Sequence, residues 1–266
     1  MTSYRIASLY RYPVKGLSPE RLPRAELTKG AYFPGDRLFA IENGPSGFDA
    51  AEPQHQTKLK FLMLMRNEAL ARLSTRYDDA TGELVIAEGG REAARGDLGT
   101  PEGRLAIEAF MRRFVPGELR GSPKVLTAPD GFRFTDSRIG YVSLINLASV
   151  QALEDMVGAP VDPLRFRGNI HLEGLAPWAE FDLVGQVLEG PGGLRLKVTK
   201  RIERCAATNV DPATGARDLQ IPKTLMRNLG HFDCGIYAEV IAGGLLSEGE
   251  RLAPAAKAQA DLPFAS

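Results

Sequence analysis

Short hydrophobic runs, separated by glycine and proline, dominate the pattern along this chain. Such runs are typical of β-strands, which hold few residues and end at turn-forming ones. The pattern predicts strands at Tyr4–Tyr12, Arg37–Glu42, Leu70–Tyr77, Leu84–Ala87, Lys124–Thr127, Tyr141–Ile145, Phe166–Leu172, Val184–Leu188, Leu194–Val198 and Cys234–Ile241. The sequence Asp-Ala-Thr-Gly at 79–82 predicts a hairpin turn between two of them.

Helical spacing is confined to two segments. Thr100 followed by Pro101 has the composition of a helix start, and apolar residues recur at helical intervals from Leu105 to Phe114. A second helix is expected at Ala148–Val157. Many strands with few helices favour barrels or closed sheets, so we expect a mainly β (α+β) fold.

We place a boundary between two domains near residue 100. The preceding run 88–97, rich in glycine and charge, is interpreted as a surface loop. The chain would then hold an N-terminal β-barrel-like domain at 1–100 and a second β-barrel domain at 101–266. The alanine-rich tail from Ala253 is expected to lie on the surface.

Charge and hydropathy exclude several classes of protein. The 33 basic and 33 acidic residues balance, so no overall field would attract nucleic acid or an anionic membrane. The sequence shows neither a signal peptide nor an apolar run long enough to cross a bilayer. We expect a cytoplasmic protein that binds neither nucleic acid nor membrane.

The cysteines carry the clearest chemical signal. Cys205 and Cys234 are the only two, too few for a disulfide framework. Cys205 lies close to Lys200, Arg201 and Arg204, and cations near a thiol favour the thiolate that binds metal or attacks substrates. Burial as an ordinary core residue is the alternative for such a cysteine.

Other familiar sites find little support. A zinc site from Cys205, His231 and Cys234 lacks the paired spacing of zinc ligands. Walker, dinucleotide and Gly-x-Ser-x-Gly signatures are missing. Cys234 lies in an alternating strand and is expected in the core, and Trp178 is expected to serve packing.

Four separated segments resemble the MOSC proteins, which are named for the C-terminal domain of molybdenum-cofactor sulfurase. Their sequences are Tyr-Pro-Val-Lys-Gly-Leu at 12–17, Gly-Asp-Arg at 35–37, Arg-Phe-Arg-Gly-Asn-Ile at 165–170 and the Cys205 segment with its Val-Asp-Pro-x-x-Gly tail at 210–215. The resemblance is to the branch with an additional N-terminal MOSC β-barrel, which is similar to the amidoxime-reducing component and to bacterial reductases of N-hydroxylated bases. It implies that 1–100 is this N-terminal domain and 101–266 the MOSC domain.

The resemblance also implies a molybdenum cofactor of the molybdopterin type. Carried over residue by residue, the thiolate of Cys205 would bind the metal, and a set of cationic and amide groups would hold the cofactor's phosphate. That set is Lys15, Gly16, Arg37, Arg167, Asn169 and Arg204. Gly16 stands where many relatives have serine, which removes a hydroxyl but leaves the backbone N–H.

Two further positions, Asp211 and Thr208, could serve the cofactor or a substrate. Arg167 and Asn169 are two residues apart on an expected strand, so they should point the same way. Asp211 could orient a substrate or a water, or only form its turn; Thr208 could contact the metal's oxygen ligands, or only cap the loop. We count both as candidate catalytic residues with Cys205.

The resemblance implies an oxidoreductase that reduces small N-hydroxylated compounds. Because the chain carries no cysteine-rich electron-transfer module, electrons would come from separate partners of the ferredoxin, flavin reductase or cytochrome type. A second hypothesis is a sulfur carrier, in which Cys205 receives a persulfide from a pyridoxal-phosphate-dependent desulfurase. A third is a carrier of molybdenum cofactor without turnover.

Overall fold

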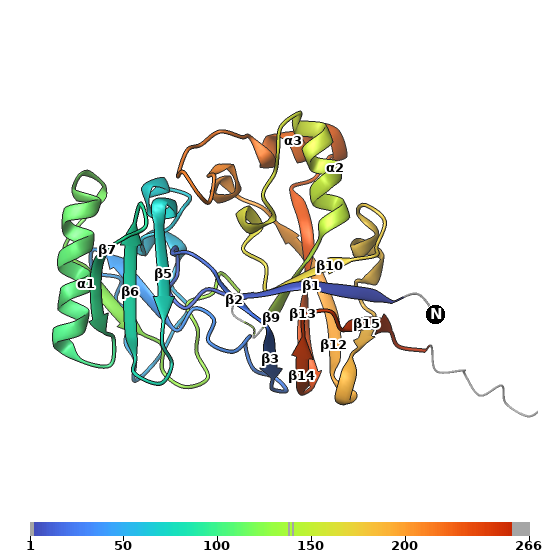
Figure 1. The fold of residues 1–266 in the computed structure, drawn as a ribbon, viewed down its shortest axis with the longest axis horizontal. Helices are drawn as coiled ribbons and strands as arrows, with labels where there is room; N and C mark the ends of the chain where they lie inside the picture. The colour runs from blue at the N-terminus through green and yellow to red at the C-terminus, as the bar shows by residue number, and fades with distance from the viewer. Residues whose placement is uncertain (1–2, 138, 140, 257–266) are drawn as a thin grey trace, which may run out of the picture.

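A seven-stranded mixed β-barrel, in which only the β9–β10 pair is parallel, forms the right-hand half of the molecule in Figure 1, which shows a computed structural model. The structure describes residues 3–137, 139 and 141–256. Around the barrel the strands follow the order β10 (Ile170–Glu173), β9 (Tyr141–Asn146), β13 (Asp233–Ala242), β12 (Arg195–Glu203), β11 (Val187–Glu189), β15 (Arg251–Pro254) and β1 (Tyr4–Arg11). Pairing of β1 with β10 closes the ring, and β2 (Glu20–Leu22) extends it beside β1.

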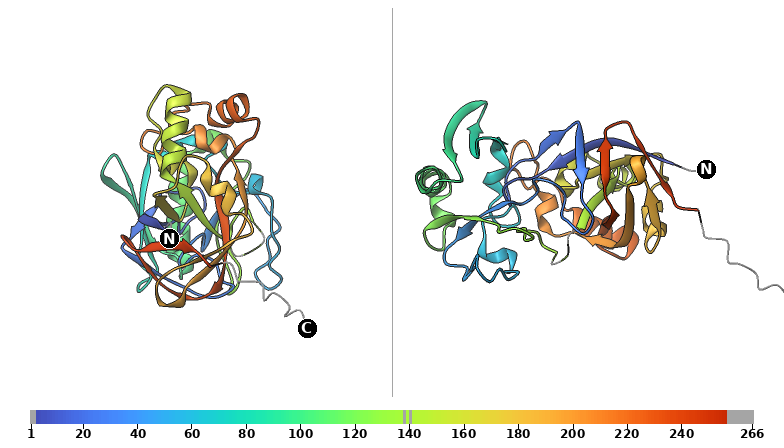
Figure 2. Two further views of the ribbon diagram at one scale, coloured as in Figure 1. Left: turned by 90° about the vertical axis from the view of Figure 1, so that its right-hand side faces the viewer. Right: turned by 90° about the horizontal axis from the view of Figure 1, so that it is seen from below.

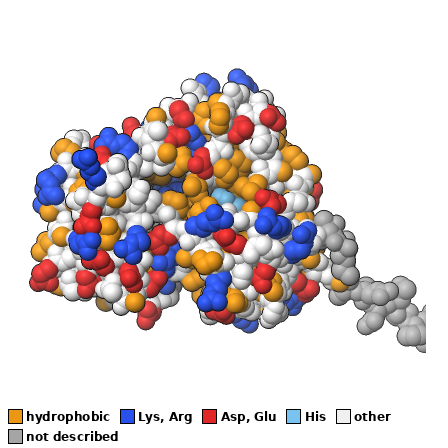
Figure 3. Space-filling model, viewed as in Figure 1, with side chains coloured by type: hydrophobic (Ala, Val, Ile, Leu, Met, Phe, Trp, Pro, Cys, Tyr) orange, Lys and Arg blue, Asp and Glu red, His pale blue; other side chains and the backbone are white. Residues whose placement is uncertain are grey.

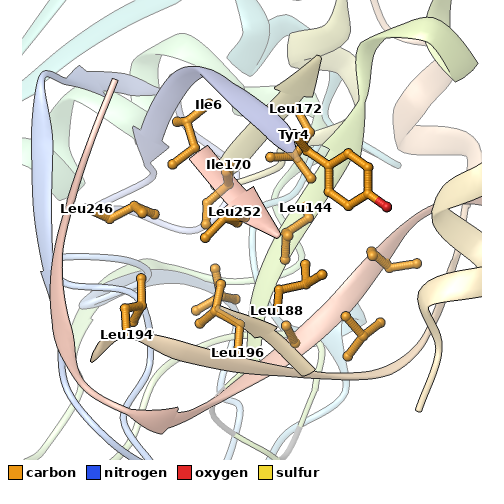
Figure 4. Packing of buried hydrophobic residues seen from close by; sticks show 14 of the residues in the cluster. Tyr4, Ile6, Leu144, Ile170, Leu172, Leu188, Leu194, Leu196, Leu246 and Leu252 are labelled. Carbon is orange, nitrogen blue, oxygen red and sulfur yellow. The ribbon is translucent and has the colours of Figure 1, made fainter. Parts of the chain in front are cut away.

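Alternation of apolar residues along the strands fills the barrel. Leucine, isoleucine and valine side chains from most of its strands meet inside, as Figure 4 shows for Leu144, Leu196 and Leu252 among others. These three side chains are fully buried. Burial of such side chains stabilises the fold by about 1.5–3 kcal/mol each.

A second core lies in the N-terminal lobe, which we define as β4 to β8 with α1. Here β4 (Phe39–Asn43) pairs with β8 (Pro123–Thr127), and β5 (Leu73–Tyr77), β6 (Glu83–Glu88) and β7 (Arg91–Asp97) form a meander. Helix α1 (Pro101–Phe114) covers β7 at the far left of Figure 1. Ile107 and Met111 of α1 join the lobe's core.

The two remaining helices cover one end of the barrel. α2 (Leu147–Val157) and α3 (Ile221–Leu229) pack against each other above it, and Figure 2 shows them from two further sides. A small sheet of β3 (Arg24–Leu27) and β14 (Gly244–Ser247) lies at the opposite end. Among the described residues, no helix is long and apolar enough to span a membrane.

The predicted mainly β fold is confirmed, including the closed barrel. Both predicted helices are present, and the Thr100 side chain caps α1 by accepting a hydrogen bond from the Gly103 N–H at 3.1 Å. The hairpin turn at 79–82 connects β5 to β6.

Several element predictions are wrong. Helix α3 was not expected, and the strands expected at 70–77 and 184–188 begin only at Leu73 and Val187. Residues 91–97, expected in a loop, form β7, because the two glycines at 89–90 with positive φ turn the chain back onto β6. The strand expected at 166–172 begins only at Ile170. Arg251–Pro254, partly assigned to a surface tail, is the barrel strand β15; residues 257–266 of that tail lie outside the described residues.

The boundary near residue 100 stays a prediction. Strand pairing joins the two ends of the chain, since β1 lies between β10 and β15 of the barrel. On the other side, α1 packs on β7 of the N-terminal lobe although it follows residue 100.

Candidate functional site

One cavity of about 490 Å³ is lined by residues from segments far apart in the sequence. The segments come from the part of the chain between β1 and β4, from the N-terminal lobe, from the 133–143 region, and from the barrel and its loops. They contribute Lys15, Gly16, Asp36, Arg37, Lys58, Met63, Asp136, Tyr141, Arg165, Arg167, Asn169, Lys200, Arg201, Arg204, Cys205, Thr208 and Tyr237, among others. The fold thus brings most of the predicted site residues to one place.

Cys205 lies directly after β12, where the strand gives way to a short 3₁₀ helix at Ala206–Asn209. Its thiol is free and partly buried. The backbone N–H and the hydroxyl of Thr208 both donate to the Cys205 carbonyl, at 3.1 and 2.9 Å. The Thr208 hydroxyl therefore caps this turn and fixes the backbone beneath the thiol.

Arg204 turns its guanidinium into the protein beside the cysteine. Its Nε donates to the Cys234 carbonyl at 2.7 Å and its Nη1 to the Phe166 carbonyl at 2.8 Å. Its Nη2 is buried and finds no hydrogen-bond partner among the described residues. Burial lowers the pKa of this guanidinium, although arginine stays charged near neutral pH.

Arg167 has a similar unpaired donor. Its Nη1 donates to the Leu17 carbonyl at 2.7 Å, but its Nη2 is buried without a partner in the described part of the chain. Burial first, and then the nearby Arg37, lower the pKa of Arg167 to about 10. Arg37 forms an ion pair with Asp36, and its Nη2 donates to the Arg167 carbonyl at 3.4 Å.

Arg167 and Asn169 do not share a strand face, which corrects our expectation. Arg167 has a left-handed backbone (φ 51°) that ends a 3₁₀ helix, and both residues precede β10. The Asn169 amide is used by the protein: its Nδ2 donates to the Tyr10 carbonyl, and its Oδ1 accepts from the backbone and hydroxyl of Ser143. Asn169 thus shapes the cavity by joining β1 to β9.

Lys15 reaches an acidic partner that the sequence did not reveal. Its Nζ donates to Asp136 Oδ1 at 2.6 Å and to the Phe134 carbonyl at 2.9 Å. Burial lowers the pKa of Lys15, and Asp136 opposes that effect. Burial acts to raise the pKa of Asp136, but Lys15 and then Lys58 outweigh it and hold that pKa at about 2.

Lys58 is a cation that lines the same cavity as the cysteine, and sequence reasoning missed it. Its Nζ lies 3.9 Å from Asp136 Oδ2. Burial acts to lower its pKa, but Asp136 and a side-chain hydrogen bond with Cys205 raise it overall. Lys58 follows an irregular loop without any motif, so no local signal marks it.

The glycine at position 16 is required by the backbone. Gly16 has φ 84°, and a Cβ there would lie 2.8 Å from the Leu62 carbonyl oxygen. A serine at this position would therefore need a different path of the adjoining 62–63 segment. Residues 62–63 pack closely against position 16, and this packing accounts for the departure from the family pattern.

Asp211 is not among the residues that line the cavity. Its Oδ1 accepts from the backbone of Ala213 and Thr214 within the turn, and its Oδ2 accepts from Arg165 Nη2 at 3.1 Å. Arg165 is almost fully buried and also pairs with Asp218 at 2.7 Å. The turn-forming role of Asp211 is thus the one with contacts, together with an anchor to the segment that leads to Arg167.

Cys205, His231 and Cys234 do not form a zinc site in the structure. His231 Nδ1 accepts from the backbone N–H of Asp233, and Cys234 is fully buried. Burial raises the pKa of the Cys234 thiol to about 12. Among the described residues, no group of three His, Cys, Asp or Glu side chains could hold a metal ion.

The face of the molecule drawn in Figure 3 shows no large patch of one charge. On the face in Figure 3, acidic and basic side chains are interspersed over both halves of the molecule. The cationic character of the cavity is therefore local, and it arises from side chains converging from several segments.

Comparison with solved structures gives distant similarities. The YUAD protein from Bacillus subtilis has a TM-score of 0.44 at 11% identity, over 94% of each chain. YiiM from Geobacillus stearothermophilus has 0.35 at 19% identity, over 46% of this chain and 57% of that one. No curated protein matches the chain. These similarities are too low to carry an argument, so the assignment rests on domain families.

Two domain families match in the expected order. Residues 3–111 match the MOSC N-terminal beta barrel domain, and residues 133–253 match the MOSC domain. Together the two matches include every cavity residue that we predicted from the sequence. The chain is a MOSC-domain protein with an N-terminal MOSC β-barrel domain.

Proposed function

We propose that this protein binds a molybdenum cofactor in the cavity beside Cys205 and acts as an oxidoreductase on small N-hydroxylated compounds. The MOSC family is associated with molybdenum-cofactor binding and with sulfurase-like or oxidoreductase roles. The observation that carries the proposal is that Arg167 and Arg204, which line the same cavity as a free cysteine, each have a buried Nη2 without a partner among the described residues.

The donor set suits such a cofactor. A buried guanidinium N–H without an acceptor is costly, and a phosphate oxygen would supply the missing acceptor. Arg37, Arg167, Arg204 and Lys15 provide the cationic wall for the phosphate. A soft thiolate at Cys205 suits an oxidised molybdenum centre, which lies in a different chemical class from zinc.

The bound cofactor would supply the two-electron redox chemistry, while the protein supplies position, charge and exclusion of water. Thr208 fixes the Cys205 backbone, and Arg165 joins the Cys205 loop to the Arg167 segment through Asp211 and Asp218. Reduction of an N–OH group to N–H takes two electrons and two protons and releases water. The electrons would come from a separate ferredoxin, flavin reductase or cytochrome-type partner.

Lys58 and Tyr141 line the cavity together with the cations and complete its wall toward the 133–143 region. Lys58 is a cationic side chain of the same cavity, where it would add to the positive charge that faces a bound anion. Asp211 acts in this proposal as a positioning residue, through Arg165, and does not touch the substrate.

The decisive measurement is the molybdenum and pterin content of protein purified anaerobically from a cofactor-producing host. Wild type should carry both in near-stoichiometric amounts, and Cys205→Ser should lose the metal because serine offers no soft ligand. Cys234→Ala is the matched control: it removes the other thiol, which is buried in the core, and should keep the metal.

Turnover is then tested with an N-hydroxylated substrate and an artificial electron donor. Loaded wild type that reduces the substrate supports the oxidoreductase; loaded wild type without turnover favours a cofactor carrier. Protein without metal or pterin would refute the resident cofactor. In that case a persulfide on Cys205, formed with a desulfurase and detected by mass spectrometry, would identify the sulfur carrier.

A further inference from the structure

Two arginine side chains lie over the ring of one buried tyrosine. The guanidinium carbon of Arg167 is 4.2 Å from the ring centroid of Tyr12, and that of Arg37 is 4.6 Å from it. Tyr12 is fully buried. The electron-rich face of an aromatic ring attracts cations at such distances.

The backbone at both arginines is held in an uncommon conformation. Arg37 has φ 49° and Arg167 has φ 51°, in the left-handed region that residues with a Cβ rarely adopt. Such conformations persist where surrounding contacts enforce them, and they gather at functional sites. Of the non-glycine residues described, only Trp178 shares this property with the two arginines.

Tyr12 is also tied to Arg37 through the main chain. The Arg37 N–H donates to the Tyr12 carbonyl at 2.8 Å, and the Tyr12 N–H donates to Asp36 Oδ1 at 2.8 Å. Asp36 in turn pairs with the Arg37 guanidinium. Contacts of backbone and ring therefore fix Arg37 relative to Tyr12. The Arg37 side chain also donates a hydrogen bond from Nη2 to the backbone carbonyl of Arg167.

The hydroxyl of Tyr12 does not explain why this position holds a tyrosine. It is buried without a hydrogen-bond partner among the described residues, which is unfavourable for a hydroxyl. A phenylalanine would avoid that penalty and still fill the core. The contribution of the side chain to the site must come from its ring.

We propose that Tyr12 is a positioning residue whose ring holds Arg37 and Arg167 together as a two-guanidinium clamp for a phosphate-type oxyanion. This inference rests on the proposed function, because the clamp would receive the phosphate of the cofactor. Two guanidiniums repel each other, and an aromatic face attracts both of them, so the ring lowers the energy of bringing them together before any anion arrives. The Arg167 Nη2, which has no acceptor among the described residues, is the donor that the anion would take.

The test measures the binding of inorganic phosphate by calorimetry to wild type and to variants at position 12, all produced in a host that makes no molybdenum cofactor, so that no cofactor phosphate occupies the clamp. Tyr12→Phe keeps the ring and should bind within about twofold of wild type. Tyr12→Leu removes the ring and should bind about 5- to 30-fold more weakly, as expected for the loss of two cation–π contacts. Tyr10→Leu is the matched control: it truncates a neighbouring tyrosine whose ring packs on His171 and should bind as wild type.

A second series separates the ring's electrostatics from its shape. Replacing Tyr12 by phenylalanines with increasing fluorine substitution keeps the size of the ring but weakens its negative face. Phosphate affinity should fall step by step along the series, a trend that a purely structural role would not produce. This series also serves if Tyr12→Leu does not fold.

Three outcomes overturn the proposal: no phosphate binding by wild type, wild-type affinity in Tyr12→Leu, or a fluorinated series without any trend. Failure of the proposed function is recognised separately, because it appears as missing molybdenum and pterin. Phosphate binding that depends on the Tyr12 ring in a protein without pterin would leave the clamp intact and assign it to another phosphorylated ligand.

Discussion

Single buried side chains in this protein are matched to partners to very different degrees. Arg165 is paired with two carboxylates and leaves only its Nε without a partner, whereas Arg167 and Arg204 have no carboxylate partner and each keep an Nη2 without an acceptor, all among the described residues. Burying a polar group without a partner destabilises the fold. An anion that accepted from these arginines would therefore stabilise the protein.

His171 illustrates the same principle away from the cavity. It is 3% exposed on β10, packs against the Tyr10 ring, and has a buried Nε2 without a partner in the described chain. Burial lowers the pKa of this imidazole to about 4. The native state thus keeps His171 neutral at a pH where an exposed histidine becomes charged.

We predict an acid sensitivity that depends on His171. As the pH falls below about 6.5, His171 takes up a proton in the unfolded chain but not yet in the folded one. The contribution of His171 to the free energy of unfolding is therefore fully present above that pH and declines progressively toward pH 4. The loss attributable to this residue should reach up to about 3 kcal/mol. Urea unfolding at pH 7.5 and pH 4.5 measures it.

The controls compare how much stability each variant loses between pH 7.5 and pH 4.5. His171→Phe should fold and lose less stability between the two pH values than wild type does. His55→Gln, at a loop position where the ring Nε2 lies 3.0 Å from the Thr135 carbonyl, should keep the wild-type dependence. Equal pH dependence in wild type and His171→Phe would contradict the prediction.

At this scale the sequence predicted much of the site. The four motifs located Lys15, Arg37, Arg167, Arg204 and Cys205, which the fold brings to one cavity. Lys58 and Asp136 were missed because each lies in an irregular segment and meets the site only through tertiary contacts. The sequence left the role of Asp211 open, since an aspartate before proline suits a turn as well as a substrate.

Among the secondary-structure elements, α1 and β7 approach each other unusually closely. A Cβ added to Gly96 would lie 2.2 Å from the Gly103 carbonyl oxygen, and one added to Gly103 would lie 2.0 Å from the Asp97 carbonyl oxygen. The helix start and the strand end are therefore in backbone contact through two glycines. That contact places the apolar face of α1 against the core of the N-terminal lobe.

We predict that Gly103→Ala destabilises the protein by about 1–3 kcal/mol. Alanine favours a helix over glycine by about 1 kcal/mol, but the clash with a rigid backbone forces α1 away from β7 and outweighs that gain. Chemical denaturation measures the change. Gly117→Ala is the matched control, because a Cβ at Gly117 meets nothing within 4 Å, and it should change stability by less than about 0.5 kcal/mol.

An unchanged or increased stability of Gly103→Ala would show that the helix can shift without loss of packing. In that case the two glycines would not be what sets the distance between α1 and β7.

The element predictions succeeded where a local signal is strong. Thr100 and Pro101 fixed the start of α1, and alternating apolar residues located most barrel strands. β7 was missed because its side chains are largely exposed and carry no apolar alternation. The early start assigned to β10 failed because Arg167 takes a left-handed conformation, which tertiary contacts impose.

On the scale of the whole molecule, the barrel is closed by strands from both ends of the described chain. β1 pairs with β10 on one side and with β15 on the other, so neither end can be removed without opening the ring. Ile6 and Leu9 of β1 also belong to the barrel core and are fully buried. This pairing could not be predicted from the sequence, because pairing between distant strands leaves no local pattern.

We predict that a fragment containing only residues 101–266 does not form the native barrel. Loss of β1 leaves the edges of β10 and β15 unpaired and exposes the apolar side chains that Ile6 and Leu9 cover. Circular dichroism near 280 nm and the sharpness of thermal unfolding would measure this. A fragment that unfolds cooperatively with the stability of the full chain would disprove it.

The matched control joins residues 3–30 to the same fragment through a flexible linker. The fused chain restores β1, β2 and β3 and lacks β4 to β7. It should recover a cooperative transition in part, since the barrel core is complete except for Phe33 while the site still lacks Arg37 and Lys58.

Because β1 closes the barrel, the order of synthesis determines when the barrel can form. During translation β1 leaves the ribosome before any other described strand, while its neighbour β15 follows all the others. The ring is therefore completed only when synthesis of the described chain is nearly over, after every residue that lines the cavity has been made. If loading of a cofactor requires the closed ring, we expect it to be a late step of maturation.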